Sequence, residues 1–383
     1  MEDFRKYYVS YALFSFSNGL FSIFANVLFF SNGNLSEVIY YQIAYQLSQL
    51  VFFIVSTLLM KYISSRILFS TGNILRGMVV LGLLSFSFLS SNGALFGLIM
   101  GIPSGIFWGG NATFSLQISR QTNRFSFLSR NSSISGLFSL IAPTIAGFLI
   151  AYSEATGILK YLNDFVVVSI CLILSGIMGL TIKVSGEKGG LMKISSTIVS
   201  ESGYNKFRLY FFCSSVLGII LSNVVSVYIF YLTGNYIITG TFGTVTAAIA
   251  FLSNIMAPRL TQYFKWYAHV AIFVIIVGSF LFYIRTFNQV FFIFLGSALI
   301  FYFISPVTNL GMTEFMGYLD KYKTTRHFWI NREYYLNFGR IVSLGSVLWI
   351  YTFYGLASTI YLMPVFSLTM LGYIPILLKG KKS

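Results

Sequence analysis

The chain has 383 residues, of which 56% are hydrophobic, 19% aromatic and only 9% charged. Soluble domains carry about 25% charged residues, so this chain is too poor in charge to be a soluble protein, and it is too apolar to be disordered. Its formal net charge of +15 would suit a nucleic-acid partner, but apolar runs long enough to cross a bilayer separate the charges. The composition therefore indicates a polytopic membrane protein whose surroundings are lipid, and no nucleic-acid partner is expected.

Twelve apolar runs follow one another along the chain, each long enough for a transmembrane helix. They are predicted at residues 7–30, 37–60, 67–90, 94–118, 132–152, 163–183, 207–232, 237–257, 268–286, 289–312, 336–354 and 357–378. The longest connection, between the sixth and seventh runs, is polar and contains four glycines. It divides the chain into two sets of six predicted spans.

The basic residues are distributed unevenly between the connections. Of the 25 lysines and arginines, 22 fall in tails, connections or adjoining span ends on one side, Lys160 and Arg285 fall on the other, and Arg76 lies within a span. Short basic connections stay in the cytoplasm. We therefore expect a multi-pass protein of the cytoplasmic membrane with both termini in the cytoplasm.

Two related segments indicate an internal duplication. Residues 124–130, RFSFLSR, follow the fourth run, and residues 326–332, RHFWINR, follow the tenth; both read Arg-x-x-aromatic-aliphatic-small or polar-Arg. Chance similarity between basic loops would explain this pair alone. However, Pro103 and Pro306 in the same two runs are separated by nearly the same offset, which favours two duplicated halves.

These features together resemble the major facilitator superfamily. Residues 131–150, NSSISGLFSLIAPTIAGFLI, are similar to the fifth span of that family, and residues 72–77, GNILRG, resemble text early in the third span of one branch of drug exporters. The loop at residues 61–66, KYISSR, lacks the aspartate and glycines of the family's Gly-x-x-x-Asp-Arg-x-Gly-Arg-Arg motif. The resemblance implies an all-α integral membrane protein of twelve transmembrane helices in two pseudo-symmetric six-helix bundles, at residues 1–184 and 207–383, joined by a cytoplasmic linker at 185–206.

The candidates for a substrate cavity are polar and aromatic residues in the middle of the spans. Gln42, Tyr45, Gln46 and Gln49 recur at three- and four-residue spacing and share one helix face. An amide that faces lipid is left unsatisfied, so this face should turn inward, either to line a cavity or to bond between packed helices. The complete set of cavity candidates is Asn18, Gln42, Tyr45, Gln46, Gln49, Trp108, Asn111, Asn223, Thr246, Tyr302 and Asn309.

The acidic residues all lie outside the middle of the predicted spans, although proton-driven transporters usually hold a carboxylate or histidine in the membrane. The candidates for coupling or gating are Glu37, Arg76, Glu314, Glu333 and Arg340. Glu37 and Glu314 could equally be solvated residues at span ends. Arg76 is expected to reach the inner face or to bond Asn73, with anion binding as the alternative. Glu333 and Arg340 share a helix face and could form a gate with loops of the first half.

The chemistry-bearing residues do not favour an enzyme. The sequence has no phosphate loop, no metal-ligand cluster and few acids or histidines, so we expect no cofactor, no metal and no catalytic residue. The prediction is a monomeric secondary transporter that moves a small neutral, amphipathic or anionic solute by alternating access, with efflux as the favoured direction. A lipid or glycolipid flippase and an uncoupled facilitator for uptake are the alternatives on the same fold.

Overall fold

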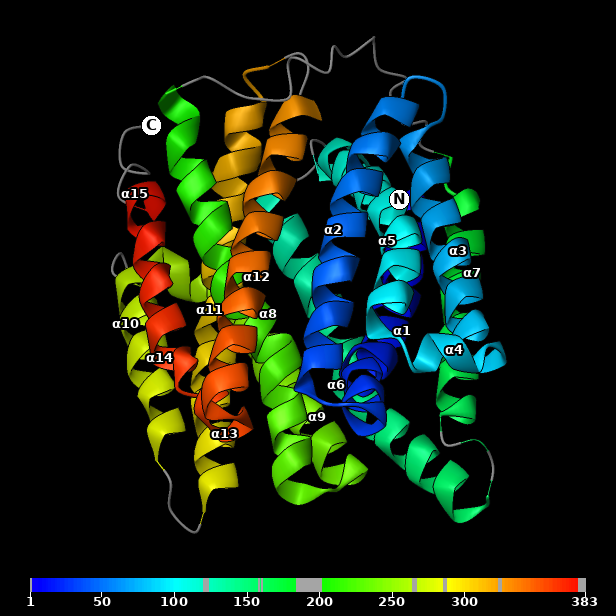
Figure 1. Cartoon of the computed structure of the whole chain (residues 1–383). Helices are drawn as coiled ribbons and strands as arrows, with labels where there is room; N and C mark the ends of the chain where they lie inside the picture. The colour runs from blue at the N-terminus through cyan, green and yellow to red at the C-terminus, as the bar shows by residue number, and fades with distance from the viewer. Residues whose placement is uncertain are drawn as a thin grey trace.

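The computed structural model describes residues 2–119, 124–157, 159, 161–183, 202–263, 267–284, 288–322 and 326–377. Most of the predicted linker at 185–206, together with Lys160 and Arg285, lies outside these residues. Within them, the long helices run roughly side by side along one axis (Figure 1). Ten helices are long and apolar enough to cross a membrane by length and composition, and Tyr267–Tyr283 is a shorter apolar helix.

Residues 184–201, which lie outside the described ranges, separate the elements into two groups along the chain. The first group is α1 (Glu2–Asn32), α2 (Leu35–Leu59), α3 (Ser65–Ser85), α4 (Ser87–Ser90), α5 (Gly93–Ser119), α6 (Arg124–Ala155) and α7 (Leu162–Leu180). The second is η2 (Ser202–Tyr204), α8 (Asn205–Thr233), α9 (Tyr236–Tyr263), α10 (Tyr267–Ser279), η3 (Phe280–Tyr283), α11 (Gln289–Leu319), α12 (Arg326–Tyr354), α13 (Leu356–Thr359), α14 (Leu362–Ser367), η4 (Leu368–Tyr373) and α15 (Ile374–Leu377).

Each of the twelve predicted spans corresponds to one helix or to a run of short ones, so the predicted all-α membrane fold is confirmed. The third span is broken at Phe86, whose backbone is extended between α3 and α4. The last span consists of α13, α14, η4 and α15. It is separated from α12 by Gly355, whose φ of 77° lies in the left-handed region that glycine adopts without strain.

Two helices begin eight and ten residues before the predicted starts of their spans. The spans expected to begin at residues 132 and 336 begin at Arg124 and Arg326 as α6 and α12. The two related basic segments, expected in loops, therefore form the first turns of these helices. Hydropathy marks where a segment becomes apolar, whereas backbone hydrogen bonding continues through the polar turns that precede it.

The helices pack both within and between these groups, and the contact between α6 and α9 is among the most extensive. In the first group α2 and α3 both pack on α5, while α1 packs on α6 and α7; in the second, α8 packs on α12 and α11 on α9 and α10. The groups meet where α6 contacts α9, α2 contacts α12 and α1 contacts α8.

The contact between α2 and α5 depends on glycine. Five glycines recur every fourth residue along the α5 face that packs on α2: Gly93, Gly97, Gly101, Gly105 and Gly109. A Cβ atom at Gly105 would lie 2.5 Å from the carbonyl oxygen of Gln49, and one at Gly101 would lie 2.7 Å from that of Tyr45. The two backbones therefore touch along most of their length, as small residues allow in membrane helix pairs, and this contact fixes the rotation of α2 about its axis.

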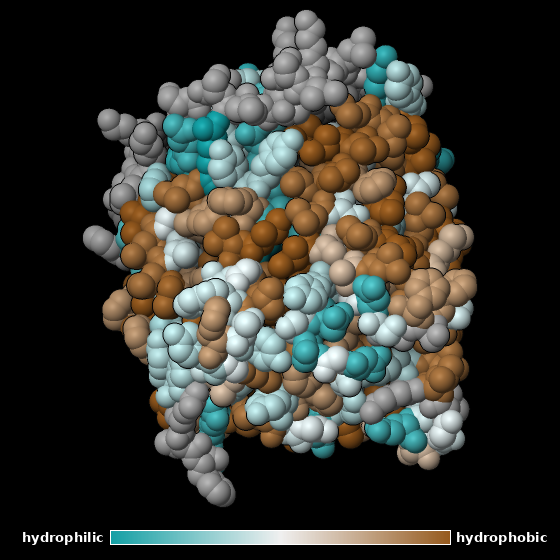
Figure 2. Space-filling model, in the orientation of Figure 1, coloured by the Kyte–Doolittle hydropathy of each residue, from teal (hydrophilic) through white to brown (hydrophobic). Residues whose placement is uncertain are grey.

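The outer surface is strongly apolar. Figure 2 shows hydrophobic side chains over much of one face, with hydrophilic side chains at the upper edge and in a patch lower down. Large apolar side chains such as Phe273, Phe291 and Phe353 are mostly exposed on α10, α11 and α12. In water such a surface would aggregate, so these faces are suited to contact with lipid.

Candidate functional site

A cavity of about 480 Å³ lies between the two groups of helices. Its walls come from α1, α2, α3 and α5 on one side and from α8, α11 and α12 on the other. Ten of the sequence-predicted residues line it: Asn18, Gln42, Tyr45, Gln46, Gln49, Arg76, Trp108, Asn223, Glu333 and Arg340. The volume is in the range of small-molecule sites.

The predicted polar face of α2 forms one wall of this cavity. Gln42, Tyr45, Gln46 and Gln49 all line it. Two of them also bond across to the second group: Gln42 donates to Asn223 Oδ1 at 2.9 Å, and Gln46 accepts from Arg340 at 2.8 Å. The two interpretations of this face, cavity lining and bonding between helices, therefore both describe what the side chains do.

The cavity is closed at the end of the bundle where α1 ends and α2 begins, which we call the far end. Asn26 and Gln42 each donate to Asn223 Oδ1, at 2.8 and 2.9 Å, and Gln42 also donates to Asn26 Oδ1 at 2.8 Å. We call these three residues the amide cluster. Beyond it, the ring of Phe30 meets that of Phe230 edge-on, with centroids 6.4 Å apart.

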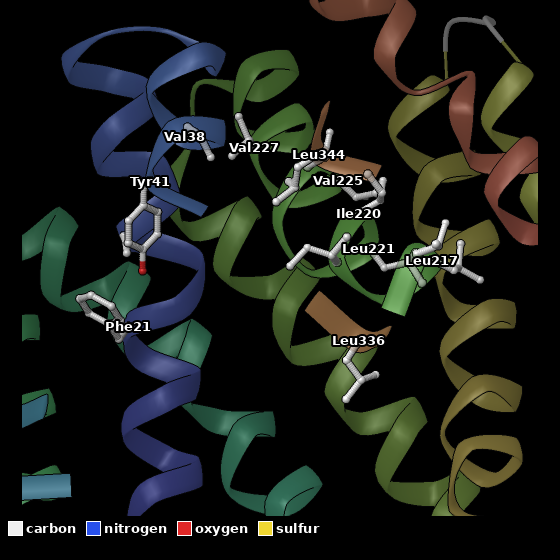
Figure 3. Packing of buried hydrophobic residues seen from close by; sticks show 14 of the residues in the cluster. Phe21, Val38, Tyr41, Leu217, Ile220, Leu221, Val225, Val227, Leu336 and Leu344 are labelled. Atoms are coloured by element: carbon white, nitrogen blue, oxygen red, sulfur yellow. The ribbon is translucent and has the colours of Figure 1, made fainter. Parts of the chain in front are cut away.

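Buried apolar side chains from both groups belong to one hydrophobic core. Figure 3 shows Val38 and Tyr41 of α2 on one side, and Leu221 and Val227 of α8 on the other. These side chains are buried. Gln42 and Asn223 of the amide cluster also line the cavity, and the hydrogen bond between them joins the two groups at the far end.

Arg76 faces the cavity and is only 4% exposed. Its Nη2 donates to Asn18 Oδ1 at 3.3 Å, and its guanidinium lies 5.1 Å from the ring centre of Phe14. The expected bond to Asn73 is not the one formed, because Asn73 donates to Ser175 Oγ at 3.0 Å instead. The side chain therefore turns toward the centre of the bundle rather than along α3 to the inner face, because Asn18 and the aromatic rings hold it there.

The other charged groups of the cavity come from α12. Arg332 forms an ion pair with Glu333, and Arg340 donates to Gln46 on α2. We had expected Glu333 and Arg340 to meet loops of the first half. Arg340 instead contacts the middle of a helix, because α12 begins ten residues earlier than hydropathy indicated and Arg340 therefore lies well inside it.

Six candidates lie away from the cavity lining. Asn111 accepts from Tyr7, Thr246 donates to its own helix, Tyr302 donates to Met256 Sδ, and Asn309 bonds Ser132 and Asn254. Glu37 accepts from the Gly93 N–H at 3.1 Å, and Glu314 is exposed. The four polar or aromatic residues among them bond within or between helices, which is the alternative role for such groups in membranes.

The sequence reasoning missed several residues. Tyr210, Ser214 and Ser215 on α8 and Arg332 on α12 line the cavity. The adjacent Ser214 and Ser215 in an apolar run are a sequence signal for a cavity wall. Arg332 gives no such signal, because hydropathy predicts a loop at this position. Asp164, in the first turn of α7, was also passed over because it lies at a span end, yet it is fully buried.

Asp164 gives a stability prediction. Neither carboxyl oxygen has a hydrogen-bond partner within the described residues, and burying a carboxyl group without a partner is costly in either protonation state. We expect Asp164→Asn to leave the melting temperature of the detergent-purified protein unchanged or higher. Glu333→Gln is the matched comparison and should lower it, because Arg332 loses its ion pair. A lower melting temperature for Asp164→Asn than for Glu333→Gln would contradict this account.

Comparison with known sequences gives limited information. No protein-family model matches the chain. An uncharacterized protein of Bacillus subtilis (strain 168), YqgE, is 25% identical over 255 residues, which are 65% of this chain and 59% of the relative. The chain thus matches less than two thirds of that relative's length.

Comparison with solved structures identifies the fold. A bacterial homologue of the iron transporter ferroportin in its outward-facing state has a TM-score of 0.67 and 11% identity, over 98% of this chain and 99% of its own. The Escherichia coli fucose:proton symporter FucP has a TM-score of 0.67 and 14% identity, over 100% of this chain and 99% of its own. FucP is a major facilitator superfamily transporter, and the chain therefore has the major facilitator superfamily fold.

Proposed function

We propose that the chain is a secondary transporter that carries a small neutral, amphipathic or anionic solute across the cytoplasmic membrane. The observation that carries this proposal is the cavity between the two groups of helices, which both groups line with polar side chains. Polar groups in the middle of a membrane span are costly and usually mark a transport pathway.

The proposed mechanism is alternating access, in which one group of helices rocks against the other around the cavity. The amide cluster closes the far end, so transport requires these hydrogen bonds to break while the opposite end closes. From the basic residues we propose that the termini lie in the cytoplasm. We propose export as the direction, because aromatic side chains such as Trp108 and Phe211 suit an amphipathic cargo.

The test measures access to the cavity without knowledge of the cargo. Ser222 lines the cavity and is exposed to it, so Ser222→Cys, in a chain whose Cys171 and Cys213 are changed to serine, reports access. A membrane-impermeant thiol reagent is applied to either face of oriented vesicles. We expect labelling from both faces, in vesicles that do not leak the reagent.

The control is Ser175→Cys, because Ser175 is fully buried between α7 and α1. It should remain unlabelled from either face. Labelling of Ser222→Cys from one face only would show a cavity that does not alternate, and the transport proposal would then be wrong.

A further inference from the structure

The guanidinium of Arg76 has unused hydrogen-bonding capacity. Its Nε and Nη1 atoms are buried and have no hydrogen-bond partner among the residues that the structure describes. Among the described residues, the Arg76 side chain forms one hydrogen bond, from Nη2 to Asn18. No acidic residue of the described ranges forms an ion pair with Arg76. A buried arginine on a cavity wall is thus left with free N–H donors.

The surroundings hold this guanidinium in place without neutralising it. Phe14 and Phe107 lie 5.1 and 5.9 Å from it, measured to their ring centres. The position of Phe107 is itself fixed, because a Cβ at Gly72 on α3 would lie 2.5 Å from the Phe107 backbone nitrogen. Aromatic faces attract a cation but leave its N–H groups available. The side chain is therefore positioned in advance for a further partner.

The rest of the cavity wall does not supply the missing negative charge. Glu333, the one acid among the lining residues, forms an ion pair with Arg332. Arg340 donates to the neutral amide of Gln46. The described lining thus carries three arginines and one glutamate, and an uncompensated positive charge is costly inside a membrane. A bound anion would remove that cost.

We infer that the cavity binds a small organic anion whose carboxylate pairs with the free N–H groups of Arg76. This inference rests on the proposed transport function and names its substrate class. Arginine matches a carboxylate with parallel, charge-assisted hydrogen bonds. Phe21, Tyr41 and Trp108 line the same cavity and provide an apolar surface for the body of the anion, so the ligand is a monocarboxylate with an apolar or aromatic part.

The experiment compares acids with their uncharged amides. The purified protein is titrated with benzoate, indole-3-acetate and hexanoate, and separately with the primary amide of each, while its melting temperature is recorded. A ligand that binds the folded protein raises this temperature. We expect at least one carboxylate to raise it and the corresponding amide to have no effect. Phenyl phosphate is included to distinguish a carboxylate site from a phosphate site.

Two variants locate the binding. Arg76→Gln should raise the dissociation constant at least tenfold for the carboxylate that stabilises the unsubstituted protein. Arg76→Lys should restore part of the affinity. Arg259→Gln is the matched control, because Arg259 is an exposed residue at the end of α9 and its loss removes the same charge. The melting temperature without ligand verifies that each variant is folded, and Arg76→Lys carries the test if Arg76→Gln does not fold.

Several results would overturn the inference. These are equal shifts by acid and amide, a shift by phenyl phosphate alone, no shift by any carboxylate, or unchanged carboxylate binding in Arg76→Gln. Labelling of Ser222→Cys separates this inference from the transport proposal. Access from both faces without carboxylate binding would reject the anion and retain transport. Carboxylate binding with access from one face would retain the anion and reject transport.

Discussion

Replacing Gly105 by valine is expected to prevent stable folding of the chain. A Cβ at this position would lie 2.5 Å from Gln49 O, 2.7 Å from Phe53 N and 2.8 Å from Phe52 C. All three are backbone atoms of α2, so no side-chain rotation can relieve the overlap, and the two helices must separate. Overpacking a core costs about 1–3 kcal/mol and more where the backbone must shift. The melting temperature in detergent and the yield of monodisperse protein on size-exclusion chromatography measure the effect.

Gly345→Val is the matched control, because a Cβ on Gly345 of α12 would meet no neighbouring side chain or helix within 4 Å among the described residues. It should fold with little change in melting temperature. If Gly105→Val were as stable as Gly345→Val, the close approach of α2 and α5 would be wrong.

Asn223→Ala is expected to increase access to the cavity from the far end. The Asn223 Oδ1 atom accepts from both Asn26 and Gln42, so its removal eliminates both hydrogen bonds between the two groups. Such bonds are worth about 0.6–1.7 kcal/mol each in membranes, and the loss of two should favour the open far end by roughly tenfold or more. In the proposed topology the far end faces outside the cell, so the labelling rate of Ser22→Cys on the cavity wall, from the outside of intact cells, measures this shift.

Ser226→Ala is the control for this substitution. Ser226 lies one turn further along α8, and within the described residues it donates only to backbone carbonyls of its own helix, those of Ser222 and Asn223. Its loss should leave the labelling rate unchanged. An equal rate for the Asn223→Ala and unsubstituted chains would show that the amide cluster does not hold the far end closed.

The fold could be predicted from the sequence because lipid imposes a simple rule. Each span must be apolar for about twenty residues, and the connections must carry the charges. The same rule located the polar face of α2, because four residues at helical spacing can only face one way. It could not locate the starts of α6 and α12, since polar residues outside the apolar layer form helix or loop equally well by hydropathy.

The cavity was harder to predict than the spans. Asn223 and Asn309 both looked like inward-facing amides, yet Asn223 lines the cavity and Asn309 bonds Ser132 and Asn254 instead. The difference depends on the rotation of each helix about its axis and on which helix packs beside it. The sequence of a single helix determines neither. Arg76 was assigned a structural role for the same reason. Its partner Asn18 is 58 positions away in the sequence.

The glycine contact between α2 and α5 has a consequence for movement. Two backbones that touch along most of their length cannot slide past one another, because each glycine sits against the carbonyl of a particular residue. In the proposed transport cycle, the glutamine face of α2 and Trp108 of α5 must then move together as one rigid unit. Deformation is left to the boundaries between the groups, where α6 meets α9 and α2 meets α12. A solute bound to α2 and α5 would keep its contacts with these two helices during the movement. It would exchange only the contacts that the second group supplies.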